Sequence, residues 1–280
     1  MKRLLVLIAL LAFNTASYAT DEYIYGDNAD GTNPYIFKID LTTGGNVVAT
    51  YQGLSGINGR GVVTVGNTMY YTSATTNSIF AYNLSTNTDM GAVFSIPSAT
   101  SLSTIAYDGT NIYVGDYSGS DHVYEYSLTG TLINTLSLAG CTGGCDGLEY
   151  FNEGGVGYLI ENRGDAQDPY DVYNAATGVL VTSALISPPV QSTGIAFDGT
   201  DFYVSNIYNS SLGEYTESGT FVKTVNLTGG TFLIEDLSVD YNLVIPPPPP
   251  NGVVPEPSSF LLLGTGVLGM AGAIRRKLMV

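Results

Sequence analysis

The sequence predicts an all-β protein, a five-bladed β-propeller placed between two processing segments. A similar run of residues recurs five times at intervals near 45 residues. The chain of 280 residues contains 34 Gly and 21 Tyr but only 12% charged residues, a composition typical of a turn-rich β protein. The first repeat also lacks a strand that reappears after the last one, as expected for a closed ring.

The first segment, 1–19, has the pattern of a secretory signal peptide. Lys2 and Arg3 precede an apolar run over 4–13, and Ser17 and Ala19 are small residues at a cleavage site. The alternative is a retained anchor helix, but ten apolar residues are too few to span a core of about 30 Å.

The body, 20–243, contains the repeats. Each repeat has a Tyr-rich run, and the corresponding positions are separated by 46, 43, 45 and 45 residues: Ile24, Tyr70, Tyr113, Tyr158 and Tyr203. Two further alternating segments follow each run, and a buried-looking strand ends in a tight turn before it. Asp-Gly at 108–109 and 198–199 supplies the positive φ that such turns need. Each unit is therefore four short antiparallel strands, which is a propeller blade.

The ring closes through its two ends. No inner strand precedes the first run, whereas 234–241 aligns with the inner strand at 193–198 of the last repeat. We expect 234–241 to pair beside 23–26, which removes open sheet edges.

The other processing segment follows a Pro-rich linker over 244–253. Segment 254–280 contains Pro255-Glu256-Pro257, an apolar stretch at 260–274, and Arg275-Arg276-Lys277. This is an extended hinge, a short hydrophobic helix and a basic stop that stays cytoplasmic. The alternative is an ordinary membrane anchor, for which fifteen apolar residues are marginal.

This order of features resembles the PEP-CTERM sorting signal of Gram-negative bacteria. The resemblance implies export, transient anchoring of the tail in the inner membrane, and cleavage near 255–257 by an exosortase. It implies release to the cell surface or to an extracellular polysaccharide matrix. The body is similar, through segments such as 112–126, to NHL or YncE-like propeller repeats, and that likeness implies fold alone.

The charge excludes nucleic acid as a partner. Nine basic residues stand against 25 acidic ones, for a net charge of −16. Five of the nine basic residues lie in the terminal segments, as does one acidic residue, so the body holds four basic and 24 acidic residues and carries about −20. Such a surface attracts divalent cations and repels anionic lipid.

The sequence predicts no catalytic residues. A Ser/His/Asp relay would need His122, the one histidine, which we expect on the surface of an outer segment. Cys141 and Cys145 are expected to form a small local disulfide, because the protein is exported and redox motifs usually have two intervening residues.

The fourth repeat supplies weak candidates for a metal site. Glu149 lies on an expected inner strand and Asn162 near the end of the next, and their oxygens would suit calcium. Some propeller lactonases hold a divalent ion in the channel with such ligands. The alternative interpretation is an acidic loop that is exposed to solvent and binds no metal. The sequence requires no cofactor.

We expect a non-enzymatic surface or matrix propeller that acts through binding, with polysaccharide or a surface protein as partner. The alternative is a propeller-type metal-dependent hydrolase, lyase or lactonase. A third interpretation is a purely structural spacer.

Overall fold

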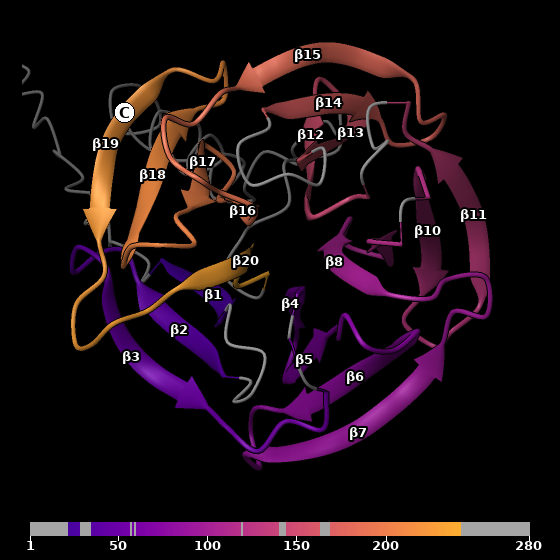
Figure 1. Ribbon diagram of the computed structural model, residues 1–280, viewed down its shortest axis with the longest axis horizontal. Helices are drawn as coiled ribbons and strands as arrows, with labels where there is room; N and C mark the ends of the chain where they lie inside the picture. Colours follow the sequence, from indigo (N-terminus) through magenta and orange to yellow (C-terminus); the bar gives the residue numbers. More distant parts are fainter. Residues whose placement is uncertain are drawn as a thin grey trace, which may run out of the picture.

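A computed structural model describes residues 22–28, 35–56, 58, 60–118, 120–139, 144–162 and 169–241. These residues form five four-stranded antiparallel sheets arranged around a central axis (Figure 1). The predicted five-bladed propeller is confirmed. The predicted signal peptide, Pro-rich linker and tail lie outside the described residues.

Each blade uses four strands in order from the axis to the perimeter. The inner strands are β20 (Ile234–Val239), β4 (Val62–Val65), β8 (Leu102–Tyr107), β12 (Gly147–Glu153) and β16 (Ile195–Phe197). The second strands are β1 (Tyr23–Asn28), β5 (Thr68–Tyr71), β9 (Asn111–Asp116), β13 (Val156–Asn162) and β17 (Asp201–Ser205). The third strands are β2 (Ile36–Asp40), β6 (Ser78–Asn83), β10 (His122–Ser127), β14 (Tyr170–Asn174) and β18 (Ser211–Thr216). The outer strands are β3 (Asn46–Tyr51), β7 (Thr88–Ser95), β11 (Leu132–Ser137), β15 (Leu180–Ile186) and β19 (Phe221–Asn226).

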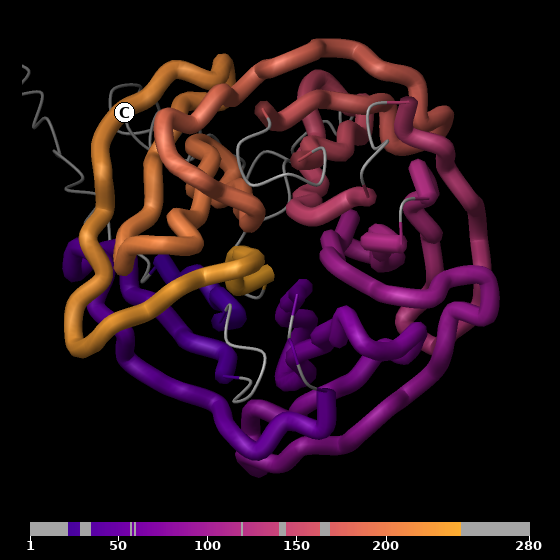
Figure 2. The backbone as a smooth tube through the Cα atoms, in the orientation of Figure 1, coloured from indigo at the N-terminus to yellow at the C-terminus, as the bar shows by residue number. Residues whose placement is uncertain are grey.

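Blade 1 is built from both ends of the body. Its sheet order is β20-β1-β2-β3, and β20 pairs antiparallel with β1 through Ile24–Val239 and Gly26–Leu237. The tube in Figure 2 shows the yellow end of the described chain meeting the indigo beginning. The inner strand that the first repeat lacks is therefore supplied by the last strand. Blades 2 to 5 each use four consecutive strands, starting at β4, β8, β12 and β16.

The turns follow the sequence chemistry. Gly109 and Gly199 have φ of +95° and +97°, as predicted for the Asp-Gly turns. In each turn the preceding aspartate, Asp108 or Asp198, accepts hydrogen bonds from the two backbone amides that follow the glycine.

The core is divided into five apolar clusters, one between each pair of neighbouring blades. The alternating aromatic and aliphatic residues of the second and third strands fill much of them, as in the cluster of Ile24, Phe37, Tyr203 and Leu212 between blades 5 and 1. Because every blade packs on two neighbours, the ring is held together by side-chain burial between sheets.

The inner strands converge closely near their starts. A Cβ at Gly61 would lie 2.8 Å from the Cα of Thr104, and one at Gly194 would lie 2.5 Å from the Cα of Asp236. Glycine at these positions lets neighbouring inner strands approach backbone to backbone. This approach brings polar residues from different blades together on the axis.

Candidate functional site

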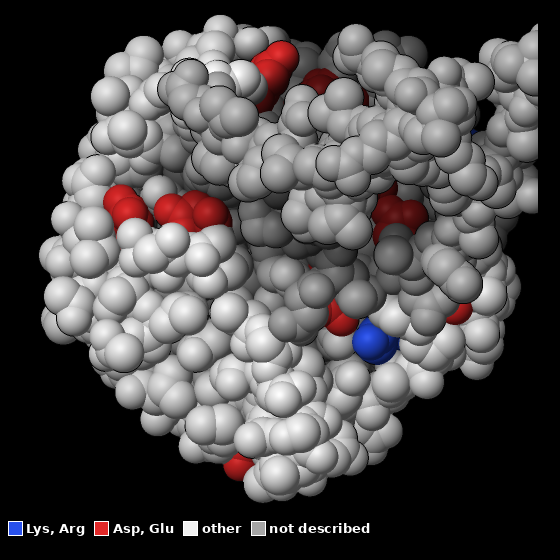
Figure 3. Space-filling view, turned by 180° about the vertical axis from the view of Figure 1, so that it is seen from behind, with Lys and Arg blue, Asp and Glu red and all other residues white. Residues whose placement is uncertain are grey.

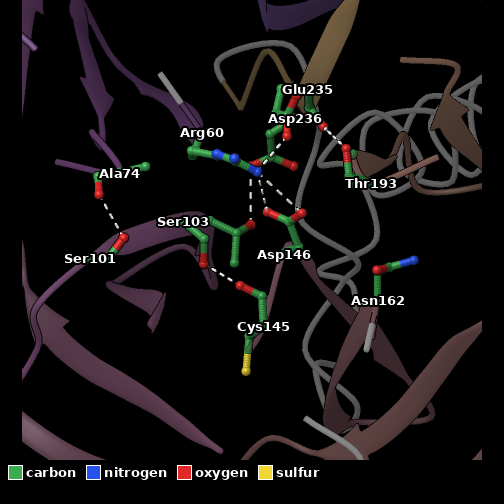
Figure 4. A network of polar contacts seen from close by, with 12 residues as sticks. Arg60, Ala74, Ser101, Ser103, Cys145, Asp146, Asn162, Thr193, Glu235 and Asp236 are labelled. Carbon is green, nitrogen blue, oxygen red and sulfur yellow. Dashed lines mark hydrogen bonds and ion pairs between the residues drawn. The ribbon is translucent and has the colours of Figure 1, made fainter. Parts of the chain in front are cut away.

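The axis is occupied near the starts of the inner strands by a cluster of charged side chains, which we call the axial cluster: Asp27, Arg60, Asp146, Glu235 and Asp236. Figure 4 shows Arg60 facing Asp146 and Glu235. They come from blades 1, 2 and 4. The four carboxyl groups are nearly inaccessible to solvent.

Arg60 joins three blades. It lies just before β4, and its Nη1 is 2.6 Å from Glu235 Oε1 and 3.2 Å from Asp146 Oδ1. Its guanidinium carbon also lies 4.8 Å from the centre of the Tyr117 ring. Desolvation would lower the pKa of Arg60, but the carboxylates of Asp146 and Glu235 outweigh it and raise that pKa. The guanidinium therefore stays charged.

A β-bulge creates the rest of the cluster. The β1–β20 register shifts between Gly26 and Asn28, so that Asp27 alone faces the two residues Glu235 and Asp236. Bulges re-aim side chains that would otherwise alternate between the faces of a sheet. Here the bulge places three carboxyl groups from one strand pair beside one another at the axis.

Asp27 and Asp236 are each half satisfied. Asp27 Oδ1 accepts a hydrogen bond of 3.0 Å from the Asp236 amide, and Asp236 Oδ2 accepts one of 3.0 Å from the Thr104 hydroxyl of blade 3. Asp27 Oδ2 and Asp236 Oδ1 are buried and have no hydrogen-bond partner within the part of the chain that the structure describes. Each aspartate is at most 1% exposed.

Burial makes these groups weak acids. It raises the pKa of Asp27 and of Asp236 well above the ordinary value of 3.8, and each also lies near other carboxylates. Burial raises the pKa of Asp146 to about 7 although Arg60 opposes the shift. These buried carboxyl groups therefore keep their protons to a higher pH than ordinary carboxyl groups do.

Tyr241, which follows β20, contacts inner strands of two other blades. Its hydroxyl donates a hydrogen bond of 2.5 Å to Glu149 Oε1, and its ring meets that of Tyr107 edge-on at 5.2 Å. The Tyr150 amide donates to the same Glu149 oxygen at 2.8 Å. Burial raises the pKa of Glu149 to about 8. Glu149 thus serves an inter-blade contact.

The structure gives the two sequence-predicted metal candidates separate partners. Asn162 pairs with Gly147, whereas Glu149 pairs with Ile160 two residues away. The Asn162 side-chain amide donates to the Ser192 carbonyl at 3.3 Å. Among the described residues, no group of three Asp, Glu, His or Cys side chains is arranged to hold a metal ion.

The remaining candidates lie away from the axial cluster or outside the described residues. His122 begins β10 with a side chain that is 40% exposed. Cys145 is fully buried, but Cys141 lies outside the described residues, so the disulfide stays a prediction. Also outside the described residues are the predicted sorting residues, Pro255, Glu256, Pro257, Arg275, Arg276 and Lys277.

A cavity of about 400 Å³ opens at the seam between blades 5 and 1. Glu22, Tyr203, Glu214 and Lys223 line it, and Lys223 Nζ lies 3.0 Å from Glu214 Oε2. The pKa of Glu22 is raised to about 8. The largest cause is a side-chain hydrogen bond with Asp198, and burial of Glu22 is the next. This seam is acidic but carries a paired lysine.

The axial cluster was missed by sequence reasoning, and two signals could have indicated it. Arg60 is one of four basic residues in the body, and it precedes an expected inner strand. The sixth position of the recurring run is polar in every repeat: Asp27, Ser73, Asp116, Glu161 and Asn206. In blades 1 and 3 the aspartate at this position accepts a hydrogen bond from a backbone amide in or just before the inner strand of its own blade. Asp27 accepts from the Asp236 amide, and Asp116 accepts from the Ser101 amide.

The fold and the axial cluster define a five-bladed propeller with a polar, cross-linked axis. The chain carries a PEP-CTERM protein-sorting motif, whose family model matches residues 253–277. It is thus an exported protein that is processed by exosortase after a membrane-anchored stage of sorting, and the predicted tail motif is confirmed. Among the residues that the structure describes, there is no helix with the length and hydropathy of a membrane span.

Comparison with solved structures supports the body fold. One chain of a crystal structure of a nidogen/laminin complex has a TM-score of 0.51 at 13% identity, over 79% of this chain and 98% of that chain. Myxococcus xanthus glutaminyl cyclase has a TM-score of 0.49 at 15% identity, over 60% of this chain and 70% of that chain. At these identities the first match shows the propeller fold alone. No curated protein matches this chain.

Proposed function

We propose that this protein is a non-catalytic binding and structural module of the cell surface or extracellular matrix. The sorting motif supports delivery to that location. We further propose that the signal peptide is removed after residue 19 and that exosortase cuts near Pro255-Glu256-Pro257. The propeller body, 20–243, would then be the displayed part.

The observation that carries the binding role is the chemistry of the perimeter. We call the five outer strands, β3, β7, β11, β15 and β19, the outer belt. In a protein with 25 acidic residues, Asp89 and Lys223 are the charged residues of these strands. Asp89 accepts a hydrogen bond from Tyr71, and Lys223 pairs with Glu214. The belt therefore carries little charge: one hydrogen-bonded carboxylate and one ion-paired lysine.

The belt is apolar and hydroxyl-rich instead. Most of the exposed large apolar side chains among the described residues belong to it: Val48, Met90, Val93, Leu132, Ile133, Leu180, Val181, Phe221 and Val222. Thr, Ser and Asn are interspersed with them, as where Thr182 and Ser183 follow Leu180 and Val181 in β15. In the view from behind, acidic residues form separate patches, and the described part of the outline is mostly uncharged (Figure 3).

Such a surface suits an uncharged polysaccharide. Aliphatic side chains can cover the C–H faces of sugar rings while hydroxyl and amide groups hydrogen-bond to sugar hydroxyls. The alternative route, strand addition at an open edge, is hindered because every outer strand pairs through a register irregularity. We therefore propose that the side chains of the outer belt bind the polysaccharide.

The contacts between blades along the axis support a structural role for the propeller. Arg60 and Tyr241 use their polar groups to join blades, and Glu149 is bonded by Tyr241. The alternative, a metal-dependent hydrolase, lyase or lactonase, needs Glu149 and Asn162 to share one ligand. Two hydrogen bonds of these side chains go instead to Tyr241 and to the Ser192 carbonyl, which favours the structural role.

Affinity electrophoresis tests the proposal. The processed protein should be retarded in gels containing a neutral polysaccharide and not in gels containing a polyuronate, because the body carries about −20. Val181→Lys places a charge on the belt at a side chain 53% exposed and should abolish retardation. Val156→Lys, 41% exposed at the start of β13, is the matched control and should leave retardation unchanged. Retardation by polyuronate alone, or by neither polymer, would contradict the proposal.

A further inference from the structure

The axial cluster contains more buried acid than its basic group can neutralise. Its carboxyl groups, those of Asp27, Asp146, Glu235 and Asp236, are all buried, and Arg60 is the guanidinium among them. Glu149 is also buried, outside the cluster. The ion pairs of Arg60 use Asp146 and Glu235, and Glu149 is bonded by Tyr241. Asp27 and Asp236 have no ion pair with a basic side chain of the described residues.

The two leftover aspartates are adjacent and incompletely bonded. The Asp236 amide donates to Asp27, so the two residues are in direct contact across the β1–β20 bulge. One oxygen of each, Asp27 Oδ2 and Asp236 Oδ1, lacks a hydrogen-bond partner in the described chain. Burying a carboxylate without a partner of opposite charge costs free energy of folding. A cation next to these two oxygens would therefore stabilise the folded protein.

We propose that Asp27 and Asp236 bind one hard divalent cation of the calcium class on the propeller axis. Calcium prefers carboxylate, hydroxyl and carbonyl oxygens. The pair offers two carboxylates, and the Thr104 hydroxyl lies against that of Asp236. Zinc would instead prefer His and Cys ligands, which the cluster lacks among its described members. Two carboxylates balance the charge of one divalent ion, and water or carbonyl oxygens would complete its shell.

Such an ion would stabilise the closure of the ring. Asp27 belongs to the first strand of the body and Asp236 to the last, 209 residues later, and Thr104 adds blade 3. An ion between the two aspartates would join the strands whose pairing completes blade 1. This site is distinct from the outer belt, and it stands whether or not the belt binds polysaccharide.

The neutral alternative is a proton held between the same two groups. Burial raises the pKa of both carboxyls, so protonation relieves the same charge. The two cases differ in their response to calcium. A cation site binds calcium more tightly as pH rises, because protons compete for the same oxygens.

Calcium binding to the processed protein is the direct test. Equilibrium dialysis with metal analysis should find one tightly held calcium per chain at pH 8, and millimolar calcium should raise the unfolding midpoint by several degrees relative to chelator. Magnesium should act more weakly, since it demands stricter geometry, and equal NaCl ionic strength should not substitute.

Matched variants locate the ion. Asp27→Asn and Asp236→Asn should each weaken calcium binding at least ten-fold. Without calcium they should fold at least as stably as the wild type, because they remove a buried charge. Asp116→Asn changes the equivalent buried aspartate of blade 3, whose Oδ1 accepts hydrogen bonds from the Ser101 and Ser118 amides, and it should keep the calcium response. Asp198→Asn changes the aspartate that hydrogen-bonds to Glu22 at the acidic seam between blades 5 and 1, and it should also keep the calcium response.

Three results would overturn the proposal. The first is wild-type protein that holds no stoichiometric calcium and melts at the same temperature in calcium and chelator. The second is a calcium response that Asp198→Asn removes and Asp27→Asn keeps. The third is a midpoint that depends on pH but not on calcium, which would assign the pair to a shared proton. Dialysis of the wild type decides the first case even if a variant fails to fold.

Discussion

Arg60 Nη1 lies 2.6 Å from Glu235 Oε1, although the two residues are 175 positions apart. This contact joins the loop before β4 to β20, the strand that completes blade 1. Asp146 lies 3.2 Å from the same nitrogen, so that one guanidinium holds residues of three blades together. The acidic body thus uses one of its few basic residues at the point where the ring closes.

Replacing Arg60 should be strongly destabilising. Arg60→Met leaves Asp146 and Glu235 buried without their cation, and removal of one partner from a buried ion pair costs about 3–5 kcal/mol. Urea unfolding at pH 8 would measure the loss. Lys223→Met is the control, because Lys223 is 62% exposed and its pair with Glu214 should contribute at most about 1 kcal/mol. Equal effects of the two variants would contradict the role given to Arg60.

The strand that closes blade 1 should behave as core. Leu237 of β20 is fully buried between blades 5 and 1, so Leu237→Ala should lower the free energy of unfolding by about 2–5 kcal/mol. Leu132→Ala makes the same chemical change at a side chain 51% exposed on β11 and should cost less than about 1 kcal/mol. If thermal and chemical unfolding place both variants at wild-type stability, β20 does not close the ring.

In chelator, stability should fall as pH rises from about 5 to about 8. Burial raises the pKa of Asp146 to about 7 and that of Glu149 to about 8, from ordinary values of 3.8 and 4.5. A carboxyl group with a raised pKa binds more protons in the folded state, so its folded form is favoured below that pKa and disfavoured above it. Glu149→Gln should flatten the curve near pH 8. Unfolding midpoints that increase across this range would contradict the assignment of these shifts.

The repeat made the fold predictable, because each blade is a local unit whose strands pair with sequence neighbours. The spacing from Ile24 to Tyr203 was therefore enough to count five blades, and the Asp-Gly turns at Gly109 and Gly199 have the predicted positive φ. The offset of the first repeat also indicated where an inner strand was needed.

The axial cluster could not be predicted in the same way, because it depends on convergence between distant blades. Asp27 meets Asp236 across 209 residues, and only the bulge at Asp27 brings Glu235 and Asp236 to it together. The position of Glu149 on an inner strand made it a candidate metal ligand. Its hydrogen bond with Tyr241, however, depends on where the chain passes after β20. No local pattern around these residues specifies that geometry.

Processing of the tail tests the central claim most directly. Mass spectrometry of the protein released by its native cells should find a chain that starts at Thr20 and ends near Pro255-Glu256-Pro257, because the sorting motif spans 253–277. In cells lacking exosortase, the same body should stay in the membrane fraction with Arg275 to Lys277 attached. Release of a chain that still carries this tail, or release that does not depend on exosortase, would contradict the account.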